Sequence, residues 1–223
     1  MKVILFGATG MVGQGVLREC QNSMEVTDIL TVGRTAVETK SQKVRNLVHA
    51  DLWNYSAIER ELSGFDACFF CLGTTAAGKS ESEYQHITYG LTLAAATTLS
   101  RLNPQMTFVY VSGEGADSTE KGNVMWARVR GATENALLSL PFKGAYVFRP
   151  GIIQPLHGIE SKTKAYRLFY CLAKPVLPLM RSLFPNAIST TEQIGKAMIQ
   201  VAKSGAERRV LKPRDFEKLY TQH

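Results

Sequence analysis

The chain has 223 residues, of which 45% are hydrophobic, and this is enough to bury a sizeable core in one domain. Its formal net charge of +7 suits a phosphate ligand, an anionic membrane surface or nucleic acid, and equally a solvated basic surface. The four cysteines do not repeat a CxxC spacing, which argues against a zinc site and for buried free thiols in a reducing compartment. No signal-peptide pattern and no convincing transmembrane stretch is visible, and we therefore expect a cytoplasmic protein.

Short apolar runs alternate with longer segments of helical spacing through the first 150 residues. The runs predict strands at 2–6, 28–32, 45–49, 66–71, 106–112 and 145–148. The longer segments predict helices at 11–22, 55–63, 81–102 and 123–140. This alternation predicts an α/β fold of the Rossmann type, a doubly wound parallel sheet with helices on both faces.

The pattern changes after Arg149-Pro150-Gly151. The stretch STTEQIGKAMIQVAKSG predicts one more helix, with a capping box from Thr190 to Gln193 and a stop at Gly205. We expect one domain over 1–223, with a cofactor-binding core at 1–155 and a C-terminal lid or substrate region at 156–223.

A glycine run, GATGMVG, follows the first strand directly and opens the first helix. Gly7, Gly10 and Gly13 form the pattern GxxGxxG. One glycine allows a sharp turn, one allows a ligand to approach the backbone, and one allows the helix to pack on the strand. The helix N-terminus then stabilises a pyrophosphate. The run predicts a dinucleotide-binding site.

The end of the second strand indicates which dinucleotide is bound. The strand ends in Gly33-Arg34, where a carboxylate would select the ribose hydroxyl of NAD. Arg34 instead suits the extra phosphate of NADP, and we therefore expect NADP(H) in preference to NAD(H). Asp51 follows the third strand and is either an adenine contact or a loop or N-cap aspartate.

Several ordered motifs resemble a known family. The segments FGATGMVGQGV, VGR, CLGTT, YVSGEGAD, RVRGATENALL and YVFRPGII are similar to atypical short-chain dehydrogenases/reductases, in particular the NmrA-like and HTATIP2-like (TIP30-like) NADP-binding proteins. The similarity covers about residues 1–155. It implies a cofactor site formed by Gly7, Thr9, Gly10, Met11, Val12, Gly13, Arg34, Asp51, Leu52, Leu72, Gly73, Thr74, Arg130, Pro150, Gly151, Ile152 and Ile153.

The catalytic residues match that family only in part. The family uses a serine, a tyrosine and a lysine, and Ser112 corresponds to the serine. Aligning Gly131 and Glu134 with the family's Lys-Gly-x-x-Glu pattern puts Arg130 at the lysine and Trp126 at the tyrosine. An indole N–H cannot act as a general acid at neutral pH, and a guanidinium does not readily share its proton.

Three interpretations of this substitution stay open. Another tyrosine, Tyr84, Tyr89 or Tyr110, supplies the proton, although Tyr110 is expected in the core. Alternatively, the cofactor transfers a hydride to a substrate that needs little acid help. In the third, the protein binds NADP without turnover as a sensor or scaffold, which the NmrA-like resemblance favours. We expect this third role, with an NADP-dependent reductase or epimerase-like enzyme as the alternative.

The remaining features indicate partners only weakly. Segment 165–185 is apolar with a basic stripe, and we expect a lid over an apolar pocket or a homodimer contact rather than a membrane-binding helix. His157 is either an acid or base near the substrate or a surface residue. No metal-ligand spacing and no nucleic-acid-binding motif is present, so we expect a small-molecule substrate or a protein partner.

Overall fold

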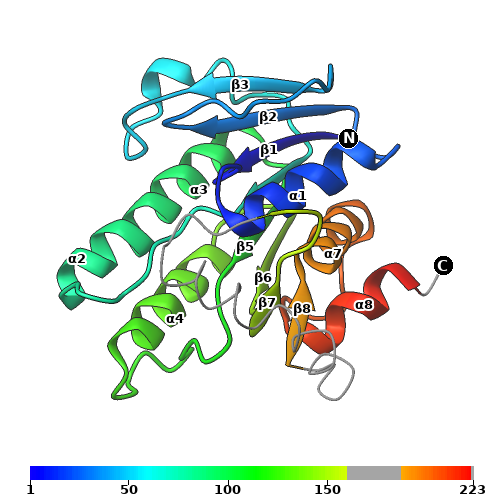
Figure 1. Cartoon of the computed structure of the whole chain (residues 1–223). Helices are drawn as coiled ribbons and strands as arrows, with labels where there is room; N and C mark the ends of the chain where they lie inside the picture. Colours follow the sequence, from blue (N-terminus) through cyan, green and yellow to red (C-terminus); the bar gives the residue numbers. More distant parts are fainter. Residues whose placement is uncertain (160–186, 222–223) are drawn as a thin grey trace.

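The computed structural model describes residues 1–159 and 187–221. Its main sheet has seven parallel strands in the order β3-β2-β1-β4-β5-β6-β9 (Figure 1). The strands are β1 (Lys2–Phe6), β2 (Asp28–Gly33), β3 (Val44–Val48), β4 (Ala67–Phe70), β5 (Thr107–Val111), β6 (Gly144–Phe148) and β9 (Val210–Leu211). The strand order reverses between β1 and β4, and ligands of such sheets bind at the carboxyl ends of the strands beside this point. The predicted fold class is confirmed.

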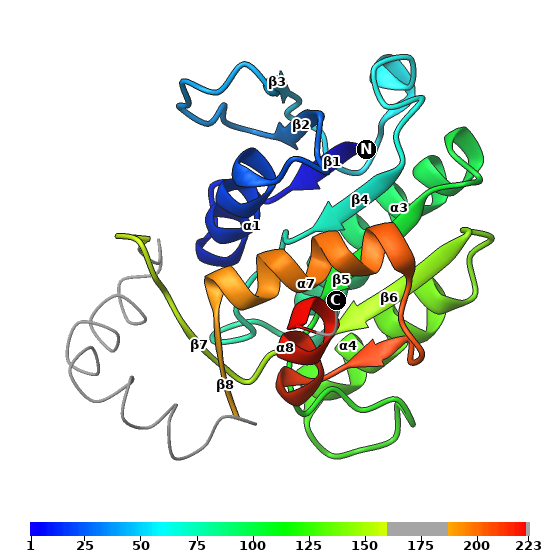
Figure 2. The ribbon, with the colours of Figure 1, turned by 90° about the vertical axis from the view of Figure 1, so that its right-hand side faces the viewer.

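Helices cover both faces of the sheet. One face carries α1 (Met11–Asn22), α7 (Thr191–Ser204) and α8 (Pro213–Thr221), whose apolar residues share a core cluster with alternate strand residues (Figure 2). The other face carries α2 (Glu81–Gln85), η2 (His86–Gly90), α3 (Leu91–Leu102) and α4 (Met125–Leu138). Within the described residues, no helix combines the length and the apolar character needed to cross a membrane.

Helices α1 and α7 approach each other closely because glycines lie at their contact. A Cβ atom on Gly15 would lie 2.6 Å from the Cβ of Thr191, and one on Gly195 would lie 2.7 Å from the Cγ of Glu19. Overpacking of this kind is destabilising, so the contact depends on both glycines. The predicted capping box from Thr190 to Gln193 is present at the start of α7.

Much of the predicted C-terminal lid belongs to the layered fold. Strand β9 pairs with β6, and α7 packs on α1. A second, two-stranded sheet joins β7 (Ile152–Gln154) to β8 (Ile188–Thr190). A lid therefore has only 156–187 available, and of this 160–186 lies outside the described residues. That gap includes the basic apolar segment 165–185 and Cys171.

The sequence also misjudged some local structure. The helix predicted at 55–63 is only the short 3-10 turn η1 (Ser56–Ile58), and the one predicted at 81–102 contains the π-helical turn η2. Asn103 accepts hydrogen bonds from the amides of Gly64 and Phe65, at 2.7 and 3.0 Å. This contact with a residue distant in sequence holds the chain directly after the predicted helix, and Tyr55 and Leu62 are buried.

Candidate functional site

The glycine loop between β1 and α1 is held by backbone contacts that exclude side chains. Gly7 has a φ of +75°, and a Cβ atom there would lie 2.6 Å from the carbonyl carbon of Cys71, at the end of β4. A Cβ atom on Gly13 would lie 2.1 Å from the carbonyl oxygen of Gly7. The amide of Gly10 donates to the same oxygen at 2.9 Å. The turn and the helix–loop contact predicted from the sequence are therefore both present.

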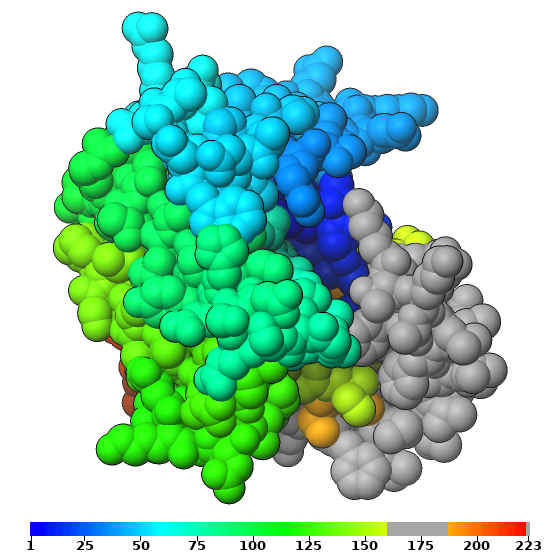
Figure 3. All heavy atoms as spheres, turned by 90° about the vertical axis from the view of Figure 1, so that its left-hand side faces the viewer, coloured from blue at the N-terminus to red at the C-terminus, as the bar shows by residue number. Residues whose placement is uncertain are grey.

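The N-terminus of α1 has no side chain that would compete with an anionic ligand. Its N-cap is Gly10, which makes no side-chain cap, and its first turn has no acidic residue. Met11 and Val12 begin the helix, and the carbonyl of Thr9 accepts a hydrogen bond from Gln14. Amides at such a terminus favour a phosphate. Figure 3 shows the dark-blue N-terminal atoms recessed behind the light-blue and teal segments that follow β3 and β4.

Arg34 lies beside this loop. The register pairs Val32 of β2 with Phe6 of β1, so Arg34 and the glycine loop leave the sheet at neighbouring points of the same edge. The Arg34 side chain is exposed and makes no hydrogen bond or ion pair with any residue that the structure describes. Its guanidinium is thus available to a ligand.

The loops after β3 and β4 border the same edge of the sheet. The carboxylate of Asp51 accepts a hydrogen bond from the amide of Trp53 at 2.9 Å, while Leu52 is buried in the core. Leu72 is partly buried and packs on that core. Gly73 and Thr74 continue the loop, and a Cβ atom on Gly73 would meet nothing within 4 Å.

Trp53 is a residue of this edge that the sequence analysis did not select. Its ring stacks on His86 of η2 with centroids 5.0 Å apart and 14° between the planes. The side chain is nevertheless 45% exposed. The signal in the sequence was a tryptophan directly after Asp51-Leu52, but the stacking depends on a residue 33 positions further along the chain.

Ser112 lies directly after β5 and is part of a buried polar network. Its hydroxyl donates to the carboxylate of Glu134 on α4. Glu134 is 1% exposed and also pairs with Arg149, whose Nε donates to the two carboxylate oxygens at 3.1 and 3.0 Å. Arg149 donates in addition to Ser118 at 2.6 Å. The hydroxyl of Ser112 therefore already donates its hydrogen bond to a carboxylate.

Gly113, the residue after Ser112, faces Arg130. A Cβ atom on Gly113 would lie 3.5 Å from Nη1 of Arg130. The Nε of Arg130 donates to the phenol oxygen of Tyr84 at 3.0 Å. Trp126, one turn earlier on α4, covers Gly115, where a Cβ atom would lie 3.1 Å from the indole. The structure thus brings the substituted positions Trp126 and Arg130 to the end of β5.

The three tyrosines considered as proton donors differ in environment. Tyr110 is 2% exposed, as expected for a core residue, and burial raises its pKa to about 12. Tyr84 is 1% exposed and is the one that reaches Arg130. Tyr89 is partly buried in η2.

The loop after β6 is fixed at two points. The amide of Glu114 donates to the carbonyl of Pro150 at 2.9 Å. A Cβ atom on Gly151 would lie 2.6 Å from the carbonyl oxygen of Ala187. Ile152 and Ile153 then form β7, with Ile152 39% exposed. The loop is thereby held near Ser112; its closure over the cofactor stays a prediction.

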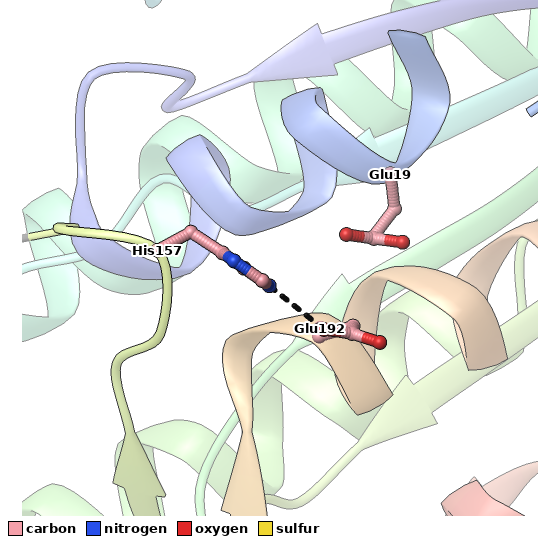
Figure 4. A group of neighbouring side chains, drawn as sticks. All are labelled: Glu19, His157 and Glu192. Atoms are coloured by element: carbon pink, nitrogen blue, oxygen red, sulfur yellow. Dashed lines mark hydrogen bonds and ion pairs between the residues drawn. The ribbon is translucent and has the colours of Figure 1, made fainter. Parts of the chain in front are cut away.

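His157 lies away from these residues, in a cluster with Glu19 and Glu192 (Figure 4). His157 Nε2 and a carboxylate oxygen of Glu192 are 2.8 Å apart. Ligand atoms of the three side chains lie within 4.8 Å of one another, a grouping that the sequence spacing did not indicate. Both carboxylates already have a cationic partner, since Arg18 pairs with Glu19, and Lys196 pairs with Glu192 at 2.6 Å. We therefore describe the cluster as an ion-paired link between the loop and α7.

Comparisons with known proteins agree with this geometry. A sequence profile of the NAD dependent epimerase/dehydratase family matches residues 3–121. Protein FMP52-2, mitochondrial, from Scheffersomyces stipitis is 33% identical over 152 residues, which cover 67% of this chain and 65% of that protein.

Two solved structures show the same fold. A short chain dehydrogenase family protein from Francisella tularensis has a TM-score of 0.64 at 13% identity and covers 92% of this chain and 91% of its own. DesIV, a dTDP-glucose 4,6-dehydratase from Streptomyces venezuelae with NAD and DAU bound, has a TM-score of 0.64 at 15% identity, with 98% and 80% covered. The resemblance to short-chain dehydrogenases/reductases is confirmed, whereas the NmrA-like branch stays a prediction.

The predicted cytoplasmic location is wrong on these comparisons. FMP52-2 and further fungal relatives are named as mitochondrial proteins. The prediction depended on seeing no leader pattern in the sequence, and such an observation does not determine a compartment.

Proposed function

The chain belongs to the NAD dependent epimerase/dehydratase family, whose members bind a nicotinamide dinucleotide, and we propose that it binds NADP(H) without the usual carbonyl chemistry of that fold. The observation that carries the proposal is the contrast between a complete glycine loop and substituted catalytic positions. In this role the protein distinguishes the oxidised from the reduced cofactor, or sequesters it. An unknown small molecule or protein partner then binds according to which form of the cofactor is present.

The cofactor half of the proposal is supported by the loop and by Arg34. Backbone amides at the start of α1 hold the pyrophosphate, with Gly7 and Gly13 providing the close approach. Arg34 binds the 2′-phosphate through a charge-assisted pair. Asp51 and Leu52 lie beside the adenine, Leu72 to Thr74 below the ribose, and the loop from Pro150 to Ile153 over the nicotinamide.

The absence of standard turnover is supported by the positions near the end of β5. A bound nicotinamide supplies or accepts a hydride, but carbonyl reduction also needs a proton donor and an orienting hydroxyl. Trp126 replaces the donor, and Gly113 provides no hydroxyl where the chain faces Arg130. The hydroxyl of Ser112 donates its hydrogen bond to Glu134, so we assign Ser112 a structural role.

A titration with NADPH and NADH tests the cofactor half. The chain has two tryptophans, Trp53 and Trp126, and both lie at the carboxyl edge of the sheet. We expect tight, NADPH-selective quenching of their fluorescence. Equal affinity for the two cofactors contradicts the NADP preference, and no quenching by either, with calorimetry in agreement, contradicts the site.

A series of restoring variants tests the chemical half. Trp126→Tyr with Arg130→Lys returns the tyrosine and lysine, and adding Gly113→Ser returns a hydroxyl facing position 130. We expect carbonyl reduction with NADPH only in the triple variant. Turnover by the unmodified protein in a broad carbonyl screen contradicts the proposal.

One observation favours an enzyme as the second candidate. Tyr84 accepts the hydrogen bond of Arg130, and a tyrosine beside a cation resembles the acid pair of the family. If the protein is an NADP-dependent reductase or an epimerase-like enzyme, Tyr84→Phe removes its turnover, whereas Ser112→Ala changes mainly its stability. No loss with Tyr84→Phe excludes this route.

A further inference from the structure

Arg130 forms no ion pair with a carboxylate in the described part of the chain. Its side chain is partly buried, and its one hydrogen bond there is from Nε to the neutral phenol of Tyr84. Both Nη atoms are without an acceptor among these residues. A guanidinium stays charged at any physiological pH, so this charge persists in the folded protein.

Glu134 is the acidic side chain that attracts the charge of Arg130, but it forms no hydrogen bond with the guanidinium. Glu134 lies one helical turn further along α4, but its carboxylate is bound by Arg149 and Ser112. Arg128, on the same helix, is a useful contrast because it forms a bidentate pair with Glu81, at 3.3 and 2.6 Å. Two arginines of one helix therefore differ in whether the protein itself provides their counter-charge.

The unpaired guanidinium faces an open position. Gly113 lies next to Nη1, and its missing side chain leaves backbone alone on that side. Tyr84 holds Nε and so fixes the plane of the group, which leaves the edge with Nη1 and Nη2 for a ligand. This edge is the geometry that binds a carboxylate or phosphate with two parallel hydrogen bonds.

We propose that Arg130 binds the oxyanion, a carboxylate or phosphate group, of a small-molecule ligand beside the cofactor. A partly buried charge is costly unless it is paired, and the ligand provides the missing partner. The inference rests on the proposed cofactor site and deepens it by naming the chemical class of the ligand. The competing interpretation gives Arg130 only the ribose hydroxyls of the cofactor.

The test uses three probes with the same ring and different head groups: benzoate, phenyl phosphate and benzamide. Each is titrated calorimetrically into the full chain saturated with NADP⁺, so that the glycine loop cannot take the anion. We expect at least one of the two anions to bind about tenfold tighter than neutral benzamide. The stronger of the two identifies the preferred oxyanion. Equal binding of all three probes, or no binding, overturns the inference.

Variants show whether Arg130 is responsible. Arg130→Gln removes the preference for the anion, Arg130→Lys keeps a weaker one, and Arg128→Gln leaves it unchanged. Gly113→Val keeps the charge of Arg130 but places a side chain against Nη1. We expect this variant to bind the anion more weakly, while NADPH still quenches its tryptophan fluorescence. An anion preference that survives Arg130→Gln overturns the inference.

The two proposals fail in different ways. A protein that does not bind NADPH in the first titration contradicts the proposed function before any probe is added. The probes are then titrated into the free protein, where the preference for an anion and its loss in Arg130→Gln decide the role of Arg130.

Discussion

The two halves of the candidate site recognise their ligands by different means. At the β1–α1 loop, the proposed recognition depends on backbone amides. It also needs glycine at positions 7 and 13, where an added Cβ atom would collide with the backbone. At the end of β5, chemistry depends on particular side chains, and Trp126, Arg130 and Gly113 are not those of the standard reaction. A backbone site tolerates few changes because a single Cβ atom blocks it. A side-chain site can be replaced while the fold persists, and the proposed function depends on such a replacement.

The largest expected effect is at Gly13. In Gly13→Ala, the Cβ atom would lie 2.1 Å from the Gly7 carbonyl oxygen, so the loop must shift. We expect NADPH quenching to be lost and the free energy of unfolding to fall by about 1–3 kcal/mol. Titration and denaturant unfolding measure the two effects. Gly33→Ala is the control for stability, because its Cβ meets nothing within 4 Å; unchanged binding in Gly13→Ala contradicts the backbone site.

Glu134→Gln is expected to lower the stability of the fold while leaving NADPH affinity nearly unchanged. The change leaves the buried Arg149 guanidinium without its carboxylate, and loss of one partner of a buried pair costs about 3–5 kcal/mol of stability. NADPH affinity of the folded variant stays within about threefold, since the hydrogen bonds of Glu134 go to Ser112 and Arg149 and not to a residue of the expected cofactor site. Glu81→Gln is the matched control, because its pair with Arg128 is more exposed and contributes about 1 kcal/mol or less. Equal destabilisation by the two variants contradicts the central role given to the network.

Arg34→Gln tests which phosphate the adenosine end recognises. We expect NADPH affinity to fall about tenfold, as for a charge-assisted pair, while NADH affinity changes by about twofold or less. Arg45→Gln serves as control, because Arg45 is on β3 and already pairs with Asp28. A similar loss for both cofactors removes the phosphate role of Arg34.

The smallest expected effect concerns pH and the link between the His157 loop and α7. Hydrogen bonds from Lys196 and then His157 lower the pKa of Glu192 from 4.5 to about 2. A carboxyl with a lowered folded pKa stabilises the protein above its unfolded pKa and loses this contribution as pH falls through the folded value. The stability difference between wild type and Glu192→Gln is therefore full above about pH 5 and declines between about pH 4.5 and 2. Its size is about 1 kcal/mol or less, because the pair is exposed. A difference that is independent of pH contradicts the lowered pKa of Glu192.

Particular residues show why prediction worked at one end of the site and failed at the other. Gly7, Gly10 and Gly13 lie within seven residues at a strand–helix junction, so local sequence fixes their roles. Ser112, Glu134 and Arg149 come from three separate elements, and only packing shows that a carboxylate accepts the hydrogen bond of the serine hydroxyl. Local spacing also could not show that Gly113 faces Arg130.

The sequence by itself determined the parallel sheet, its first six strands and the glycine loop. Apolar runs buried on both faces and a strand–glycine–helix junction are local patterns. Each of them forms the predicted structure from residues that are neighbours in the sequence. The tertiary structure alone decided that the C-terminal segment supplies β9 and α7 to the core. It also decided that Trp53 stacks on His86 and that Arg128 is paired while Arg130 is not. These outcomes depend on contacts between residues far apart in the chain, for which the sequence has no local signal.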